Sequence, residues 1–334
     1  MTQNDRIRAF IKLRNVFLDI NNNPDFDALF VNVYKNNAWF SRSNVLHAFD
    51  ALSKMIDPVK LRNWISKYTA TNKIKRVGVI IPSNIPLVGF YDFLCVLISG
   101  HVFVGKLAQS NLFLLPFVAR QLIVIEPRFK DYIFFEEEIK NIDFLIFSGN
   151  NNSSKIIDFV YNKIPRVIRK NRNSVAVLSG KESYEDLKKI AQDIFLYFGF
   201  GCRNISKIFI PHSFDFRLLL NVFNSYNYVL ENQNYLDNYN YQRTLLKIND
   251  FRFRELSNIL LVESNKISSP ISVLYFEYYS DLNYVNKKIK QYQNEIQCIV
   301  SHLKGVPNSI TFGYAQQPSL TQSPDGVDVI NLLI

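Results

Sequence analysis

The chain has 334 residues, of which 48% are hydrophobic, 14% aromatic and 20% charged. A length of roughly twice the usual ~150 residues per domain, with enough apolar residues to build cores, predicts two folded domains and excludes a disordered or collagen-like chain. Lysine and arginine exceed aspartate and glutamate by 39 − 29 = 10, which favours an anionic partner such as nucleic acid, a membrane surface or a phosphorylated cofactor.

The first 70 residues predict a helical lead-in, because short apolar stripes at helical spacing, such as Val45, Phe49 and Leu52, alternate with polar turns. Charges and amides interrupt every apolar stretch at the amino terminus, so neither a secretory leader nor its cleavage site is visible and we expect a cytoplasmic protein. The most apolar segment, residues 77–106, contains Asp92 and two prolines. It is therefore expected to be buried core, with no membrane span.

From residue 77 onward, strand and helix signals alternate, which is typical of βαβ units and a parallel sheet. The expected strands of this first half are residues 77–81, 101–106, 131–136 and 143–147, and the expected helices are residues 87–99, 113–124 and 155–162.

The basic segment PRVIRKNRN, residues 165–173, predicts a connector between domains. The alternation then starts again. Its expected strands are residues 174–178, 206–211 and 269–277, its expected helices are 183–198 and 285–296, and residues 224–241 leave open a surface excursion or a helix. We therefore expect an α/β domain with the helical lead-in over residues 1–172, a second α/β domain over 173–304, and a closing segment, about 305–334, that returns to the first.

Three cysteines, Cys95, Cys202 and Cys298, are too few and too widely spaced for a disulfide framework or a CxxC metal site, so no metal is expected. Cys202 lies in FGFGCRN, where two glycines would let a substrate approach and Arg203 would favour the thiolate. A buried core thiol is the commoner role of a cysteine, so both interpretations stay open for Cys202. Cys95 and Cys298 lie inside apolar runs and are expected to be core thiols.

Two further motifs have a chemical and a plain structural interpretation. Asn84 stands in IPSNIP between Pro82 and Pro86, where it would serve as a rigid oxyanion donor or as an Asx turn that closes the strand. Lys106 follows the strand HVFVG, where its ammonium would meet a cofactor hydroxyl or phosphate, or solvent.

In this order along the chain, these segments resemble the aldehyde dehydrogenase superfamily. The likeness is greatest to its acyl-CoA reductase branch, which is similar to the fatty-acid reductase component of bacterial luminescence. The resemblance rests on residues 77–107, 144–151, 169–180, 197–211, 269–277 and 312–333. It implies an aldehyde-dehydrogenase-like fold of two Rossmann-like α/β domains, with the active site in the cleft between them.

The resemblance implies reduction of a fatty acyl-CoA or acyl-carrier-protein thioester to the aldehyde, with NADPH as the cofactor and NADH as the alternative. Cys202 matches the catalytic cysteine, which would hold the acyl group as a thioester, and Asn84 matches the oxyanion-hole asparagine. The implied cofactor-binding residues are Pro82, Ser83, Lys106, Ser148 and Gly149. A homo-oligomer would be in keeping with the same resemblance.

At several positions this chain has residues other than those of the superfamily pattern. Where aldehyde-oxidising members have a glutamate general base, this chain has Asn171–Asn173, and the missing carboxylate suits a reductase that must protect its acyl-enzyme from water. The glutamate that commonly holds the nicotinamide ribose falls near Lys266, with Glu263 close by. His101 replaces an asparagine, and His212 follows the strand after Cys202; a structural role is expected for both, with an acid or base role as the alternative for His212.

Two other functions are alternatives to the reductase. A binding or scaffold paralogue in a lipid or pigment biosynthetic complex would keep the fold without turnover, but the joint presence of Cys202 and Asn84 argues against it. A nucleic-acid partner is not expected, because RNP-like, zinc-finger and helix-turn-helix patterns are missing from the sequence. The basic cluster of residues 166–172 would bind the phosphates of CoA and NADPH or form a solvated face.

Overall fold

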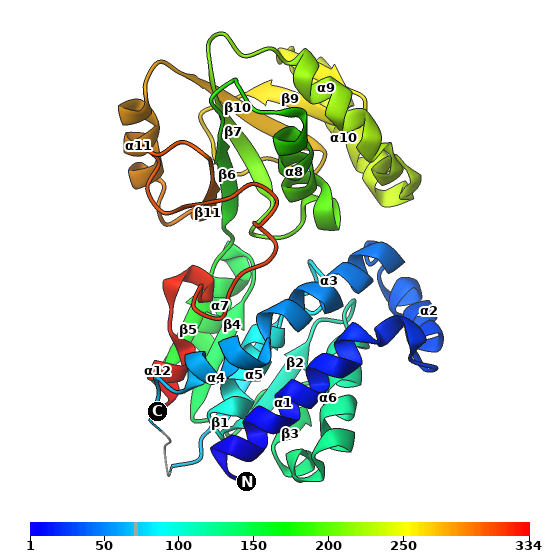
Figure 1. The fold of residues 1–334 in the computed structure, drawn as a ribbon, viewed down its shortest axis with the longest axis vertical. Coiled ribbons are helices and arrows are strands. Elements are labelled where there is room, and N and C mark those ends of the chain that lie inside the picture. Colours follow the sequence, from blue (N-terminus) through cyan, green and yellow to red (C-terminus); the bar gives the residue numbers. More distant parts are fainter. Residues whose placement is uncertain (70–72) are drawn as a thin grey trace. The chain divides into compact units, whose positions relative to one another are not determined.

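The computed structural model describes residues 1–69 and 73–334 (Figure 1). Residue 70, the last of the expected helical lead-in, lies outside the described residues. The chain divides into two compact units. Unit 1 consists of Met1–Asn171 and Gln317–Ile334, and unit 2 consists of Arg172–Gln316.

Unit 1 is built on a parallel five-stranded sheet with the strand order β3-β2-β1-β4-β5. Its strands are β1 (Arg76–Ile81), β2 (Val102–Leu107), β3 (Ile133–Phe135), β4 (Phe144–Ser148) and β5 (Arg166–Arg169). The side chains of β1, β2 and β4 are mostly buried, as expected for parallel strands that are covered on both faces. The strands predicted from the apolar runs of this half are confirmed.

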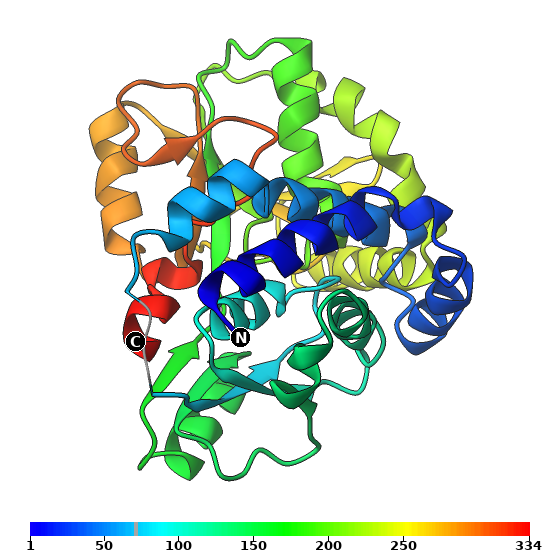
Figure 2. The same cartoon turned by 60° about the horizontal axis from the view of Figure 1, so that its bottom comes forward.

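The helical lead-in forms part of the core of unit 1. It comprises α1 (Gln3–Leu18), α2 (Phe26–Asn36), α3 (Arg42–Met55) and α4 (Pro58–Ile65), and the other helices are α5 (Phe90–Ile98), α6 (Leu114–Ile125), α7 (Asn151–Val160) and α12 (Val329–Leu333). Helix α1 packs against α3 and α6 (Figure 2). The Phe17 ring lies 5.3 Å from the Phe49 ring of α3 and 5.5 Å from the Phe90 ring of α5. Burial of these rings explains why the amino-terminal helices fold onto the α/β sheet.

Unit 2 is a seven-stranded sheet with the order β12-β11-β6-β7-β10-β9-β8, parallel except for the antiparallel edge pair β8 and β9. Its strands are β6 (Asn173–Val177), β7 (Ile205–Pro211), β8 (Phe253–Leu256), β9 (Ile259–Glu263), β10 (Val273–Tyr279), β11 (Ile296–Val300) and β12 (Ser309–Ile310). Its helices are α8 (Tyr184–Phe195), α9 (Arg217–Phe223), α10 (Gln233–Ile248) and α11 (Leu282–Gln291). None of the described helices of either unit combines the length and apolar character needed to cross a membrane.

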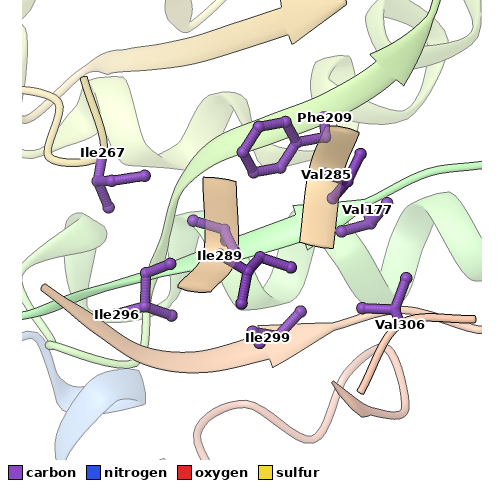
Figure 3. Packing of buried hydrophobic residues seen from close by; sticks show 9 residues of the cluster. Val177, Phe209, Ile267, Val285, Ile289, Ile296, Ile299 and Val306 are labelled. Carbon is purple, nitrogen blue, oxygen red and sulfur yellow. The ribbon is translucent and has the colours of Figure 1, made fainter. Parts of the chain in front are cut away.

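One face of the unit 2 sheet is covered by α11. Val285 and Ile289 of this helix pack onto Val177 of β6, Phe209 of β7 and Ile299 of β11 (Figure 3). These residues are at most 8% exposed, so their apolar surface is withdrawn from water and fixes α11 on the sheet.

The structure corrects two expectations and decides one alternative that the sequence left open. The predicted connector 165–173 begins with a strand, β5, although the chain does cross from unit 1 to unit 2 after residue 171. The helix predicted over 285–296 ends at Gln291, and the apolar residues that follow form β11. The open choice at residues 224–241 resolves as a 3-10 segment followed by α10, which buries Tyr235 and Tyr239.

Candidate active site

The predicted site residues of unit 1 lie at one edge of its sheet, at or just beyond the carboxyl ends of the central strands. From β1 the chain continues to β2 on one side, whereas β4 pairs with the other side of β1. Open parallel sheets bind ligands at such a reversal of strand order. The structure brings to this edge Pro82, Ser83 and Asn84 after β1, Ser148 and Gly149 at the end of β4, and Lys106 in β2 beside Ile80.

The loop after β1 is fixed by hydrogen bonds in addition to its two prolines. Asn84 is half-buried in this loop, before α5 begins at Phe90. The loop is held by Asn111 Nδ2 donating to the Pro82 carbonyl (3.1 Å), Ser110 Oγ to Ser83 Oγ (2.7 Å) and Asn37 Nδ2 to the Ser83 carbonyl (3.3 Å). The backbone that carries Asn84 is therefore tied to two separate parts of unit 1.

The loop after β4 leads directly into α7. The Gly149 amide donates to the Arg169 carbonyl of β5 at 3.2 Å, and a Cβ on Gly149 would lie 2.4 Å from the Phe147 ring, so a larger residue would not fit there. Asn150 Oδ1 accepts a hydrogen bond from the Ser153 amide (2.8 Å) and caps α7. A helix that begins at the carboxyl edge of a parallel sheet presents its positive dipole end to an anion such as a pyrophosphate.

Lys106 is exposed on β2. The pKa of the nearby Glu138 is lowered first by a hydrogen bond from Lys140. The charge of Lys106 lowers it further, to a smaller extent. An exposed ammonium at this edge of the sheet is accessible to an anionic ligand.

Cys202 lies in unit 2, in the turn that connects α8 to β7, and it is exposed. The predicted helix 183–198 ends at Phe195, because Tyr197, Phe198 and Gly199 all have positive φ (53°, 56° and 84°) and turn the chain. Gly199 adopts this conformation without the steric penalty of a side chain. Cys95, in contrast, is fully buried, and burial raises the pKa of its thiol.

Asn204 fixes the Cys202 turn to the end of α8. Its Oδ1 accepts from the Gly201 amide at 2.8 Å, while its Nδ2 contacts the carbonyls of Asp193 (3.0 Å), Ile194 (3.2 Å) and Leu196 (2.8 Å). A Cβ on Gly201 would lie 2.8 Å from Asn204 Oδ1, so glycine is needed for this close approach. A single buried amide thus satisfies the carboxyl end of α8 and shapes the turn that carries the thiol.

Two further contacts hold the same turn. Ser174 Oγ in β6 donates to the Cys202 carbonyl at 3.1 Å and also contacts Cys298 Sγ at 3.0 Å. Arg203 Nε donates to the Ala315 carbonyl. Cys298 is half-buried in β11, and burial raises the pKa of its thiol. The turn is therefore tied to β6, to α8 and to the segment around Ala315.

The remaining residues singled out from the sequence take structural or surface positions. His101 is buried, accepts from the Lys75 amide at its Nδ1 (3.2 Å), and has its pKa lowered to about 4, first by burial and then by the charge of Lys75. His212 is exposed and stacks on Tyr278 with ring centres 5.0 Å apart. Lys266 and Glu263 are both exposed.

The basic cluster of residues 166–172 does not form a single solvated face. Arg169 is buried in unit 1 and bonds both carboxylate oxygens of Asp92, at 2.6 and 2.9 Å. Arg166 contacts Asp158, whereas Lys170 is exposed. Within residues 1–69 and 73–334, no three His, Cys, Asp or Glu side chains lie close enough together to hold a metal ion.

Comparison with known proteins shows the fold. No protein-family model and no curated protein matches the chain. Among solved structures, the indole-3-acetaldehyde dehydrogenase from P. syringae, in complex with NAD+, matches 92% of this chain and 74% of its own with a TM-score of 0.67 and 11% identity. The NAD-dependent benzaldehyde dehydrogenase from Corynebacterium glutamicum matches 95% of this chain and 84% of its own (TM-score 0.66, 11% identity). The chain has the aldehyde dehydrogenase fold.

The aldehyde dehydrogenase from Bacillus cereus, in its complex with NAD+, gives the same result, with a TM-score of 0.63, 13% identity, and 93% of this chain and 78% of its own covered. The predicted fold class is therefore confirmed. The residues that support the Cys202 turn, namely Ser174, Asp193 and Asn204, were not predicted. The position of Asn204 two residues after Cys202 was the one signal that could have pointed to it, because asparagine commonly bonds to nearby backbone groups.

Proposed function

We propose that this chain is an acyl-thioester reductase that uses NADPH, or NADH as the alternative, to convert a fatty acyl-CoA or acyl-carrier-protein thioester to an aldehyde. The observation that carries the proposal is the exposed thiol of Cys202 on a turn fixed from three sides, in a chain with the aldehyde dehydrogenase fold. An accessible cysteine on a rigid turn is suited to nucleophilic catalysis.

In the first step, the Cys202 thiolate attacks the carbonyl carbon of the thioester. A bond forms between Sγ and this carbon, the bond to the carrier sulfur breaks, and the carrier leaves as its thiol. The Asn84 side chain is proposed to donate a hydrogen bond to the carbonyl oxygen while it carries negative charge. The acyl group then remains on Cys202 as a thioester.

The carboxyl edge of the unit 1 sheet is proposed to hold the dinucleotide. The start of α7, which follows Gly149, suits a pyrophosphate, whereas the Gly149 amide itself already donates to the Arg169 carbonyl. The Lys106 ammonium suits the adenosine ribose or its phosphate. When bound, the reduced cofactor supplies a hydride to the carbonyl carbon of the acyl group. Cys202 releases the aldehyde when its bond to that carbon breaks, and with one proton taken up it returns to the thiol.

The lack of a carboxylate at the expected general-base position supports reduction of the acyl-enzyme over its hydrolysis. Asn171–Asn173, at the position that the resemblance assigns to the general base, contain no carboxylate. Without a positioned base, water is a weak nucleophile toward a thioester, so the acyl group stays on Cys202 until it is reduced.

Mass spectrometry of the protein after incubation with acyl-CoAs of increasing chain length tests the proposal. We expect one acyl group on the peptide that contains Cys202, lost in Cys202→Ala and retained in the matched control Cys298→Ala. Labelling that persists in Cys202→Ala would contradict the assignment of the nucleophile. No label with any acyl-CoA or acyl-carrier-protein donor would instead favour a binding paralogue without turnover.

A further inference from the structure

Asp193 is a buried acidic residue that the proposed chemistry does not use. It lies in α8 and is 1% exposed. Its two carboxylate oxygens accept hydrogen bonds from the backbone amides of Gly313 (2.7 Å) and Ala315 (3.2 Å). The carboxylate therefore holds a segment that lies 120 residues further along the chain.

The same segment contacts the residue next to Cys202. The Ala315 carbonyl accepts a hydrogen bond from Arg203 Nε, and the Asp193 backbone carbonyl accepts one from Asn204 Nδ2. Asp193 is thus linked to both residues that follow Cys202, through its side chain to Arg203 and through its backbone to Asn204. The carboxylate is therefore connected to the turn by two hydrogen bonds that meet at the Ala315 backbone, one at its amide and one at its carbonyl.

We propose that Asp193 is a positioning residue for Cys202, and that its ionised carboxylate orients the thiol by holding Gly313–Ala315 and thereby Arg203. This inference rests on the proposed function only because it takes Cys202 as the nucleophile. The site would then be regulated by pH, because the contacts that fix the Cys202 turn depend on whether Asp193 is protonated.

The surroundings of Asp193 indicate that its carboxylate gains or loses its proton near neutral pH. Burial raises the pKa of Asp193 to about 7, while the Gly313 and Ala315 amides and the Arg203 charge act in the opposite direction. The titratable groups around it are Lys189 one helical turn earlier, Arg203, Tyr226 and Cys298. The ionised form accepts with both oxygens, whereas the neutral acid carries a proton on one of them and holds the two amides less well. Cys202 is then held best above about pH 7.

The reactivity of Cys202 toward iodoacetamide tests this role without requiring turnover. The alkylation rate of the Cys202 peptide is measured by mass spectrometry between about pH 5.5 and 8.5 in the wild-type chain, in Asp193→Asn and in Glu185→Gln, an exposed acidic residue of the same helix. Dividing each variant rate by the wild-type rate removes the titration of Cys202 itself.

At pH 8 we expect Cys202 of Asp193→Asn to be alkylated about tenfold more slowly than Cys202 of the wild type, which corresponds to the loss of one hydrogen bond to a charged group. Below about pH 6 the two alkylation rates are expected to approach each other. The Glu185→Gln ratio is expected to stay near 1 throughout. A ratio for Asp193→Asn that is near 1, or equally low at every pH, would overturn the proposal, because a purely structural role predicts no dependence on pH.

A second measurement uses the wild-type chain alone and so does not depend on the folding of a variant. The amide ¹⁵N and ¹H shifts of Gly313, recorded by NMR over the same pH range, report on the carboxylate that the amide contacts. We expect them to titrate with a midpoint near the pKa of about 7, together with the Cys202 amide. A Gly313 amide that does not titrate between pH 6 and 8 would overturn the proposal. Absence of acyl transfer would contradict the proposed function and leave these two readouts intact.

Discussion

At the scale of single residues, Asn204 is the main support of the Cys202 turn. Its amide contacts four backbone groups, all contributed by residues 193–201. Replacing it with alanine removes these hydrogen bonds and leaves buried carbonyls without a donor.

We predict that Asn204→Ala lowers the free energy of unfolding by about 2–4 kcal/mol and also slows alkylation of Cys202. Asn234→Ala, an exposed asparagine of α10, is the matched control and is expected to change the stability by less than about 0.5 kcal/mol. Urea denaturation of both variants gives the two values. Equal stability of the two variants would contradict the role assigned to Asn204.

The raised pKa of Asp193 also leads to a prediction of how the free energy of unfolding depends on pH. Its pKa of about 7 in the folded chain is above the ordinary value of 3.8, so the folded state binds a proton more tightly than the unfolded state does. The stability that Asp193 contributes is therefore complete below about pH 4 and is lost as the pH rises to about 7.

From pH 5 to pH 8 we predict that the unfolding free energy of Asp193→Asn increases relative to wild type by about 2–3 kcal/mol. Denaturation of both proteins at the two pH values measures this change. A wild-type minus variant difference that is the same at both pH values would mean that Asp193 does not titrate in this range.

Asn84 gives a prediction about catalysis. Loss of one oxyanion donor typically lowers turnover by about 10² to 10³, so we expect this decrease in the aldehyde formation rate of Asn84→Ala, with the acyl-CoA KM little changed. Asn63→Ala, an exposed asparagine of α4, is the control. Steady-state kinetics of aldehyde formation give kcat and KM for both variants. An unchanged kcat in Asn84→Ala would remove Asn84 from the mechanism.

At the scale of secondary-structure elements, β5 shows where the sequence misleads. The four basic residues of segment 165–173 suggest a solvated connector. In the structure Val167 and Arg169 alternate inward on β5, and Asp92 of α5 neutralises the buried arginine. The partner lies 77 residues earlier in the chain, so no local pattern could have revealed it.

We predict that Arg169→Met destabilises unit 1 by about 3–5 kcal/mol, because it leaves the Asp92 carboxylate buried and without its cation. Combining it with Asp92→Leu should restore part of that loss. Lys170→Met, at the exposed neighbouring position, serves as the control and should be close to wild type. A double variant no more stable than Arg169→Met would contradict this account of the pair.

Several apolar runs were correctly predicted as strands, although the equally apolar run Ile259–Glu263, which forms β9, was missed. The runs VGVII and DFLIF give β1 and β4, since buried parallel strands are continuous in apolar residues. Strand β11 was missed because it follows a polar helix after only a short turn, and its residues continue the apolar spacing of α11. The end of α8 was placed too late, because left-handed Tyr197 and Phe198 have no signature in a sequence.

At the scale of the whole molecule, the alternation of strands and helices and the order of the motifs were enough to predict the fold class. The sequence also placed the candidate residues of unit 1 at strand ends, and the sheet order then gathers them at one edge. The support of Cys202 could not be predicted, because Ser174 lies 28 residues before Cys202 and Ala315 lies 112 residues after Arg203, so both reach the turn only after folding. Asp193 is close in sequence, but its side chain acts through Gly313 and Ala315, at least 120 residues away.

The central claim is that the acyl group on Cys202 is reduced to an aldehyde. The most direct test adds NADPH carrying deuterium at both C4 positions to the isolated acyl-enzyme and follows the released product and the Cys202 peptide by mass spectrometry. We predict one molecule of aldehyde with one deuterium for each acyl group lost, and return of Cys202 to its unmodified mass. Release of the carboxylic acid, or an acyl group that stays on Cys202, would contradict the claim.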